Sequence, residues 1–163
     1  MSEDLFPCIE IGGKWVIDRQ QVRVLLVEDN ASLRNVAKLY LTLLLNYCPQ
    51  NILECRDGAE GLVLLDQLGS QKPHIILTDY LTPVMDGLTF FSQLRERYPE
   101  YYRQVVKAVW TGVSVPEERE ELTRQAPELQ LILLFKPLAI NDLMVDVEHQ
   151  LLHLFTSEYP SSS

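Results

Sequence analysis

The sequence predicts an α/β domain built around a sheet of parallel strands. Four short apolar runs have the length and composition of strands that are buried on both faces: Val24 to Val27, Ile75 to Leu77, Val105 to Val109 and Leu131 to Phe135. Longer segments with apolar residues at helical spacing separate these runs. Polar residues follow each run, and the carboxyl ends of parallel strands form the crevice in which open α/β sheets bind ligands.

The stretch IILTDYLTPVMDG, residues 75–87, organises the rest of the chain. Its apolar start predicts a buried strand that delivers Asp79 to the carboxyl edge of the sheet. Pro83 and then Asp86-Gly87 predict a turn directly afterwards. A single Asp in such a place most simply caps the next helix. The residues that follow the other runs are what favour a chemical role.

Acidic, hydroxyl and ammonium side chains follow the predicted strands: Glu28, Asp29, Asp79, Thr111 and Lys136. We expect them to converge, because parallel strands end at one edge of their sheet. Three carboxylates in one crevice repel one another, which raises their pKa values unless a cation lies among them. Oxygen ligands without His or Cys nearby suit Mg²⁺ better than a transition metal.

The remaining two groups indicate phosphoryl chemistry. Lys136 supplies a point charge that can pair first with Asp79 and then with a phosphoryl group on it. The Thr111 hydroxyl can donate to a phosphoryl oxygen. An Asp beside a metal ion, a Lys and a hydroxyl group indicates an acyl-phosphate site, in which the Asp79 carboxylate is the nucleophile.

At these residues the sequence resembles the receiver domain of two-component response regulators. The matching parts occur in the family's order: VLLVED at residues 24–29, Asp79 with PVMDG at residues 83–87, Thr111-Gly112 and Lys136-Pro137. The resemblance covers roughly residues 22–155. It implies a doubly wound, five-stranded parallel sheet in the flavodoxin-like order 2-1-3-4-5, with five flanking helices.

The resemblance also implies a reaction and its partners. A histidine kinase or phosphotransfer protein donates a phosphoryl group to Asp79 in a Mg²⁺-dependent reaction. Asp29 and Asp79 bind Mg²⁺ directly with the backbone carbonyl of Leu81, and Glu28 binds it through water. The signal leaves through the fourth helix, fifth strand and fifth helix toward a downstream protein target. We expect any homodimer to use that surface or the first helix.

The sequence departs from the family at the switch position. Leu133, three residues before Lys136, replaces the usual aromatic residue, and Phe135 faces the opposite way from Lys136 by strand alternation. A smaller shift at Leu133, or a switch carried by Trp110, is the replacement we expect.

Two further departures lie where the family places the route of the attacking water. Leu81, two residues after Asp79, and Val113, two residues after Thr111, are both apolar. Without a polar side chain to orient that water, we predict slow self-dephosphorylation.

Composition excludes several other classes of function. The 163 residues carry a net charge of −9, which argues against direct binding to nucleic acid. No apolar run approaches the about 20 residues that cross a bilayer, and we find no signal peptide, so we expect a cytoplasmic protein without membrane contact. Cys8, Cys48 and Cys55 form no C-x-x-C pair and are expected to be reduced thiols. His149 and His153 lack a third metal ligand in the pattern.

Three parts are expected along the chain: an extension over residues 1–21, the receiver-like domain over 22–155 and a flexible tail over 156–163. Gly12-Gly13 predicts a hairpin turn in the extension, with Phe6 and Trp15 as its buried residues. The extension either packs on its own domain, which is the simpler interpretation, or serves docking or dimerisation.

Two of the expected helices have distinctive sequences. The first begins after a cap at Asn30 or Ser32, and Leu39, Leu43 and Leu45 widen its apolar stripe until its C-terminal half is apolar nearly all round. We expect it to be buried, partly under the N-terminal extension; the alternative is a surface presented to a partner. Residues 114–117, SVPE, predict a capping box for the fourth helix.

The sequence therefore predicts a phosphorylation-dependent signalling receiver that is not an enzyme. The first alternative is an interaction module that works without phosphorylation, favoured by Leu133. The second is an Asp-nucleophile phosphatase, which needs a second Asp where Leu81 stands.

Overall fold

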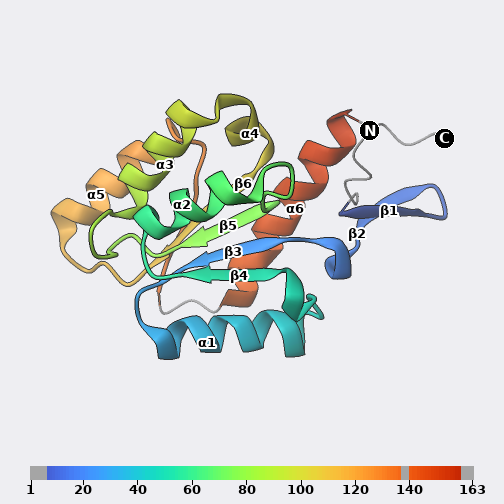
Figure 1. The fold of residues 1–163 in the computed structure, drawn as a ribbon, viewed down its shortest axis with the longest axis horizontal. Helices are drawn as coiled ribbons and strands as arrows, with labels where there is room; N and C mark the ends of the chain where they lie inside the picture. The colour runs from blue at the N-terminus through green and yellow to red at the C-terminus, as the bar shows by residue number, and fades with distance from the viewer. Residues whose placement is uncertain (1–6, 137–139, 159–163) are drawn as a thin grey trace.

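The computed structural model describes residues 7–136 and 140–158 of the chain. At its centre lies a parallel five-stranded sheet in the order β4-β3-β5-β6-β7 (Figure 1). Its strands are β3 (Val24–Val27), β4 (Ile52–Cys55), β5 (Ile75–Thr78), β6 (Val106–Thr111) and β7 (Ile132–Phe135). Numbered within the sheet alone, this order is 2-1-3-4-5, so the predicted fold class is confirmed.

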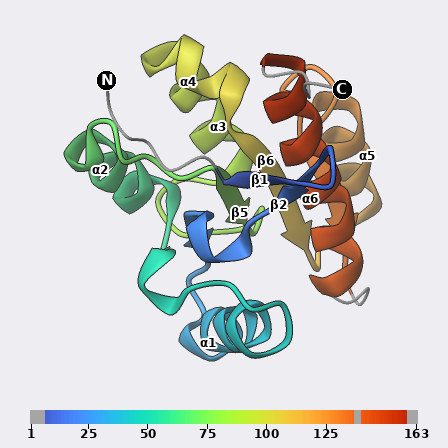
Figure 2. The ribbon, with the colours of Figure 1, turned by 90° about the vertical axis from the view of Figure 1, so that its right-hand side faces the viewer.

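Helices cover both faces of the sheet (Figures 1 and 2). They are α1 (Ala31–Leu39), α2 (Gly58–Leu68), α3 (Gly87–Arg97), α4 (Pro99–Gln104), α5 (Pro116–Gln125) and α6 (Ile140–Glu158). The short α4 was not expected: Pro99 lies just beyond the end of α3, where proline stops a helix, but proline also suits the first turn of a new helix. No helix within the described ranges is both long enough and apolar enough to cross a membrane.

Strand alternation divides the interior into two main cores. Leu26, Leu77 and Ala108 face α1 and α6, whereas Leu25, Ile76 and Val109 face α2 and α3. Because both faces are covered, the central strands are fully buried, as their continuous apolar sequence predicts.

The N-terminal residues form the predicted hairpin, with strands β1 (Cys8–Ile11) and β2 (Lys14–Ile17). Gly12 and Gly13 have φ angles of +58° and +80°, which a tight hairpin turn requires and which glycine adopts without strain. Trp15 meets Phe155 of α6 edge to face, with ring centroids 5.4 Å apart. Phe6 lies outside the described residues.

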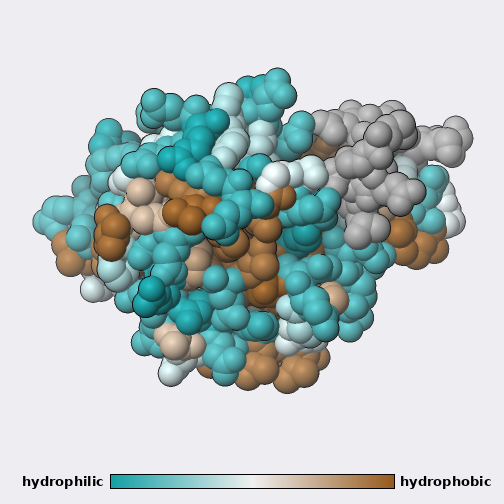
Figure 3. Space-filling view, viewed as in Figure 1, coloured by the Kyte–Doolittle hydropathy of each residue, from teal (hydrophilic) through white to brown (hydrophobic). Residues whose placement is uncertain are grey.

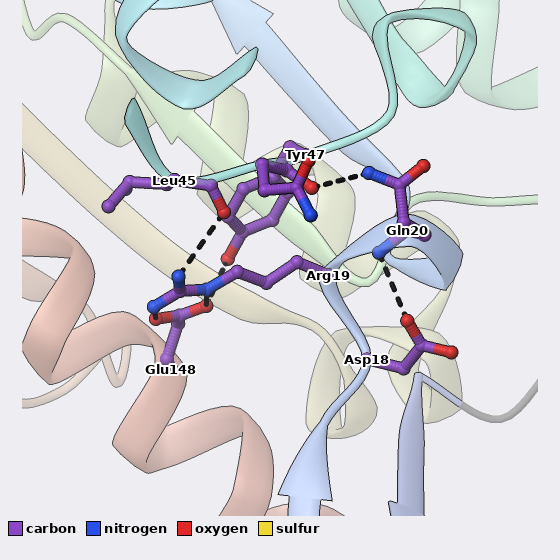
Figure 4. A network of polar contacts seen from close by, with 7 residues as sticks. Asp18, Arg19, Gln20, Leu45, Tyr47 and Glu148 are labelled. Atoms are coloured by element: carbon purple, nitrogen blue, oxygen red, sulfur yellow. Dashed lines mark hydrogen bonds and ion pairs between the residues drawn. The ribbon is translucent and has the colours of Figure 1, made fainter. Parts of the chain in front are cut away.

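A partly buried polar network joins the segment after the hairpin to the rest of the domain (Figure 4). The Arg19 guanidinium donates two 2.8 Å hydrogen bonds to the Glu148 carboxylate of α6 and a third, of 3.2 Å, to the carbonyl of Leu45. The hydroxyl of the buried Tyr47 donates to the same carboxylate over 2.6 Å. The described part of the N-terminal segment therefore packs on its own domain.

The expected burial of the first helix is wrong for most of its apolar residues. Ala37 and Leu41 are buried, but Leu33, Val36, Leu39, Leu43 and Leu44 are 45–76% exposed. Figure 3 shows apolar residues along the lower edge of the molecule, where α1 lies in Figure 1. The physical reason is that the hairpin packs against α6 and leaves this side of α1 uncovered.

The N-terminal caps of the helices agree only in part with those that the sequence predicts. Asn30 caps α1 by accepting a 3.1 Å hydrogen bond from the amide of Leu33, as predicted. The predicted capping box is wrong, because α5 starts at Pro116 behind Val115, which has no capping side chain.

Candidate functional site

The register of the sheet decides which side chains meet at its carboxyl edge. Val27 and Val109 both pair with Thr78, so Glu28 and Asp79, which follow β3 and β5, lie at the same level as Trp110 of β6. Alternation then turns these three side chains toward the face that α1 and α6 cover.

Lys136 lies beside two of these groups. Its Nζ atom is 3.5 Å from Asp79 Oδ2 and 3.8 Å from Glu28 Oε1. The three side chains are 23%, 17% and 12% exposed, respectively, so water screens their charges only in part. The structure thus brings together residues from the ends of three strands.

Burial and crowding perturb Glu28. Its pKa is raised to about 7: loss of hydration is the largest cause, the Asp79 charge adds to it, and the Lys136 ammonium offsets part of the rise. The neighbouring Asp29, which is exposed, adds a smaller contribution in the same direction through its charge and a side-chain hydrogen bond.

A small, hard cation fits the carboxylates. Glu28 Oε2 and Asp79 Oδ1 are buried and have no hydrogen-bond partner among the residues that the structure describes. Both residues line a cavity of about 30 Å³, which is room for about one water molecule or ion. In the ranges that the structure describes, no three His, Cys, Asp or Glu side chains are already clustered as a metal site, so Asp29 would have to approach from the solvent side.

The loop after β5 carries Leu81, whose side chain is 53% exposed. Gly87 fixes the far end of this loop close to the site, where its amide donates to the Tyr80 carbonyl over 2.9 Å. A Cβ atom at this glycine would lie 3.0 Å from the Asp79 carbonyl oxygen. The close approach explains why the turn after Asp79 ends in glycine.

Thr111 is the last residue of β6 and is 1% exposed. Its hydroxyl accepts a 3.3 Å hydrogen bond from the amide of Val113. Because Thr111 is one residue beyond Trp110, its side chain points to the opposite face of the sheet, next to Phe135 of β7. Thr111 therefore lies at the same edge of the sheet as Asp79, but its side chain is on the face opposite to that of Trp110.

Trp110 contacts Lys136, a relationship that sequence reasoning missed. The Lys136 Nζ atom lies 4.9 Å from the centroid of the indole ring. Arg34 of α1 was also missed; it donates a 2.6 Å hydrogen bond to the Glu28 carbonyl. Trp110 precedes Thr111 directly, so strand alternation could have suggested its orientation, but its contact depends on the lysine from β7.

The region expected to carry the switch is apolar. Leu133 pairs with Val109 and is partly buried between two clusters of the core. The ring of Phe135 lies 4.1 Å from the guanidinium of Arg119 in α5. Val113 is buried with residues of α3 and α5, so it does not face solvent as a residue flanking a water route would.

The cysteines and histidines outside this edge form no second site in the part of the chain that the structure describes. Cys8, Cys48 and Cys55 are free thiols. His149 and His153 are exposed on α6, and no third metal ligand joins them in the described part of the chain.

Comparison with known families gives a match over most of the chain. Residues 24–148 match the model of the response regulator receiver domain. The probable C4-dicarboxylate response regulator DctR of Halalkalibacterium halodurans is 34% identical over 77 residues, which are 47% of this chain and 31% of that protein. A protein-glutamate methylesterase/protein-glutamine glutaminase of Methanosarcina mazei is 31% identical over 109 residues, 66% of this chain and 26% of its own length. The chain thus spans about a third or less of these curated relatives.

Solved structures share the fold. The receiver domain of nitrogen regulatory protein C is 26% identical, with a TM-score of 0.58, over 82% of this chain and 97% of that one. The receiver domain of a signal transduction histidine kinase from Syntrophus aciditrophicus is 20% identical, with a TM-score of 0.63, over 87% of this chain and 96% of that one.

Proposed function

This chain belongs to the response regulator receiver domain family, and from that premise we propose that Asp79 accepts a phosphoryl group from a histidine kinase or phosphotransfer protein. The observation that carries the proposal is the pairing of Asp79 Oδ2 with Lys136 Nζ at 3.5 Å, while Asp79 Oδ1 has no hydrogen-bond partner within the described ranges. A carboxylate oxygen that makes no other bond is available as a nucleophile.

In the proposed reaction, a carboxylate oxygen of Asp79 bonds to phosphorus as the phosphorus–nitrogen bond of the donor phosphohistidine breaks. The electron pair of that bond stays on the imidazole, which leaves as the neutral base once protonated. Lys136 neutralises charge on the transferred group, and this electrostatic stabilisation is the main contribution a protein makes to phosphoryl transfer. The Thr111 hydroxyl would donate to a phosphoryl oxygen after turning toward Asp79.

We propose that Asp29, Asp79, the Leu81 carbonyl and, through water, Glu28 would hold Mg²⁺. The bound ion supplies positive charge that offsets the carboxylates and the phosphoryl oxygens. The two unpartnered carboxylate oxygens and the small cavity support this choice.

We propose that the signal reaches a downstream protein through α5, β7 and α6, and that the chain acts in the cytoplasm without binding nucleic acid directly. The net charge of −9 supports the last point, because contacts with phosphates need Lys and Arg. In this proposal, residues 22–155 form the signalling domain.

The experiment is incubation with acetyl phosphate and Mg²⁺, followed by intact mass. Wild type should gain one phosphoryl group, Asp79→Asn none, and Asp142→Asn, an exposed carboxyl of α6, as much as wild type. Labelling of Asp79→Asn, or none of wild type, would contradict the proposal.

A second candidate is an interaction module that needs no phosphorylation, and Leu133 at the aromatic switch position favours it. It predicts that wild type and Asp79→Asn bind the same protein partner with equal affinity, before and after treatment with acetyl phosphate.

A further inference from the structure

We infer that Trp110 is a positioning residue for Lys136, whose ammonium group it holds beside the carboxylates of Asp79 and Glu28. The inference rests on the proposed function, because it deepens the account of the same site. It adds to the proposed function a role for an aromatic ring that makes no contact with a phosphoryl donor in the proposed reaction.

The sheet register makes this placement specific. Trp110 pairs with Leu134 across β6 and β7, and Lys136 follows Leu134 by two residues on the same face of the sheet. On the other side of Trp110, Asp79 continues β5 at the same level. The indole therefore lies between the strand that carries the carboxylate and the strand that leads to the lysine.

Three contacts surround the Lys136 ammonium. Its Nζ atom is 3.5 Å from Asp79, 3.8 Å from Glu28 and 4.9 Å from the centroid of the Trp110 ring. An indole face is the strongest aromatic partner for a cation and acts within about 6 Å. Two carboxylates alone would let the ammonium slide between them, whereas the ring limits its position from the side.

A ring is well suited to this task at a phosphoryl-transfer site. Lysine has a flexible four-carbon stem and loses much of its rotamer freedom when its position is fixed. An acidic partner in place of Trp110 would compete with the phosphoryl group for the ammonium. An aromatic ring attracts the cation more weakly, so Lys136 can still move onto a phosphoryl oxygen while its stem stays beside the ring.

The same contact makes Trp110 a reporter of the site. When Lys136 moves toward a phosphoryl group on Asp79, the charge near the indole changes, and indole fluorescence responds to such a change. The chain has two tryptophans, Trp15 and Trp110. Trp15 lies in β2 of the hairpin and packs on Phe155. In the Trp15→Phe protein, all tryptophan emission therefore comes from Trp110.

The first test measures labelling by acetyl phosphate and Mg²⁺ in the Trp15→Phe protein. Trp110→Leu should lower the rate constant by about three- to thirtyfold, the range that a cation–ring contact of ordinary strength supports. Trp110→Phe, which keeps a weaker ring, should recover part of this loss. Equal rates for all three proteins, or equal losses in both variants, would overturn the inference.

The second test needs no phosphoryl transfer. In the unphosphorylated Trp15→Phe protein, Lys136→Met should shift Trp110 emission, whereas Lys14→Met on the exposed hairpin should leave it unchanged. Unchanged emission in Lys136→Met would overturn the inference even if Trp110→Leu does not fold. Failure of the proposed function is recognised separately, because Asp79 would then stay unlabelled in every variant while the emission shift persists.

Discussion

Arg19 and Glu148 lie 129 residues apart in the sequence and form a two-point ion pair that joins the N-terminal segment to α6. Glu148 is 13% exposed and also accepts a hydrogen bond from the hydroxyl of the buried Tyr47. Burial and the neighbouring carboxylate both raise the pKa of Tyr47, which keeps its hydroxyl protonated as the donor. The segment before β3 is therefore part of the stable structure of this domain.

We predict that Arg19→Ala lowers the free energy of unfolding by about 1–2 kcal/mol, because it leaves a shielded carboxylate with one partner fewer. This loss of stability is near the lower end of the range for a hydrogen bond to a charged group, because Arg19 is 40% exposed and water screens its charge. Urea denaturation measures the change. Arg103→Ala, an exposed residue of α4, should change stability by less than about 0.5 kcal/mol. Equal effects of the two substitutions would refute the role of the ion pair.

Two leucines in the π-helical turn that follows α1 (Tyr40–Leu44) should differ sharply in their contribution to stability. Leu41 is fully buried and Leu43 is 76% exposed. Leu41→Ala should lower the free energy of unfolding by about 2–5 kcal/mol through lost burial and a cavity. Leu43→Ala should change it by less than about 0.5 kcal/mol. A large loss for Leu43→Ala in the isolated chain would mean that this side is covered in solution.

Val84 should limit the stability of the loop beside Asp79. Its φ angle is +69°, which is strained for a β-branched residue, and its side chain is 87% exposed. Val84→Asn should raise the free energy of unfolding by about 0.5–1 kcal/mol, because Asn adopts this conformation more readily and little burial is lost. Val145→Asn, on an exposed position of α6, is the matched control and should give no gain in urea denaturation.

Lys107 should make stability depend on pH. Its buried ammonium donates to the carbonyls of Tyr102 and Val105, and desolvation lowers its pKa from 10.5 to about 8. The folded state therefore binds fewer protons than the unfolded state between these values, so this group makes stability rise with pH across that window. Buried thiols whose pKa values are raised to about 11 and about 12 act in the opposite sense above their ordinary pKa of 9.0.

The difference in unfolding free energy between wild type and Lys107→Met isolates the lysine from those thiols. From about pH 8 to about pH 9.5 this difference should change by about 1.5 kcal/mol in favour of wild type. Urea denaturation at both pH values measures it. A difference that is the same at the two pH values would show that Lys107 does not titrate in this range.

The phosphorylated protein should lose its phosphoryl group slowly, because Leu81 has no polar group to orient an attacking water. Val113 is buried away from solvent, so we expect only Leu81 to affect the rate of hydrolysis. Leu81→Gln should speed hydrolysis by about tenfold, equivalent to about 1.4 kcal/mol of barrier. The decay of labelled protein, followed by intact mass in Mg²⁺, measures both rates. A wild-type half-life of seconds would contradict this account.

Much of the fold could be read from the sequence because its signals are local. Continuous apolar runs identified four of the five strands of the sheet, all except β4, and Gly12-Gly13 identified the hairpin turn. The errors came where a local signal had more than one outcome. Pro99 ended α3 but also began α4, and residues 114–117 had the pattern of a capping box without forming one.

For the candidate site, the sequence by itself determined which chemical groups follow the strands, and a family resemblance indicated their order in the sheet. Only the tertiary structure decided that Trp110 stands beside Lys136, that Arg19 binds Glu148, and that one side of α1 is open to solvent. The physical reason is that apolar periodicity records which face of an element is buried, whereas a contact between distant side chains depends on strand register and on which helix a neighbouring segment packs against.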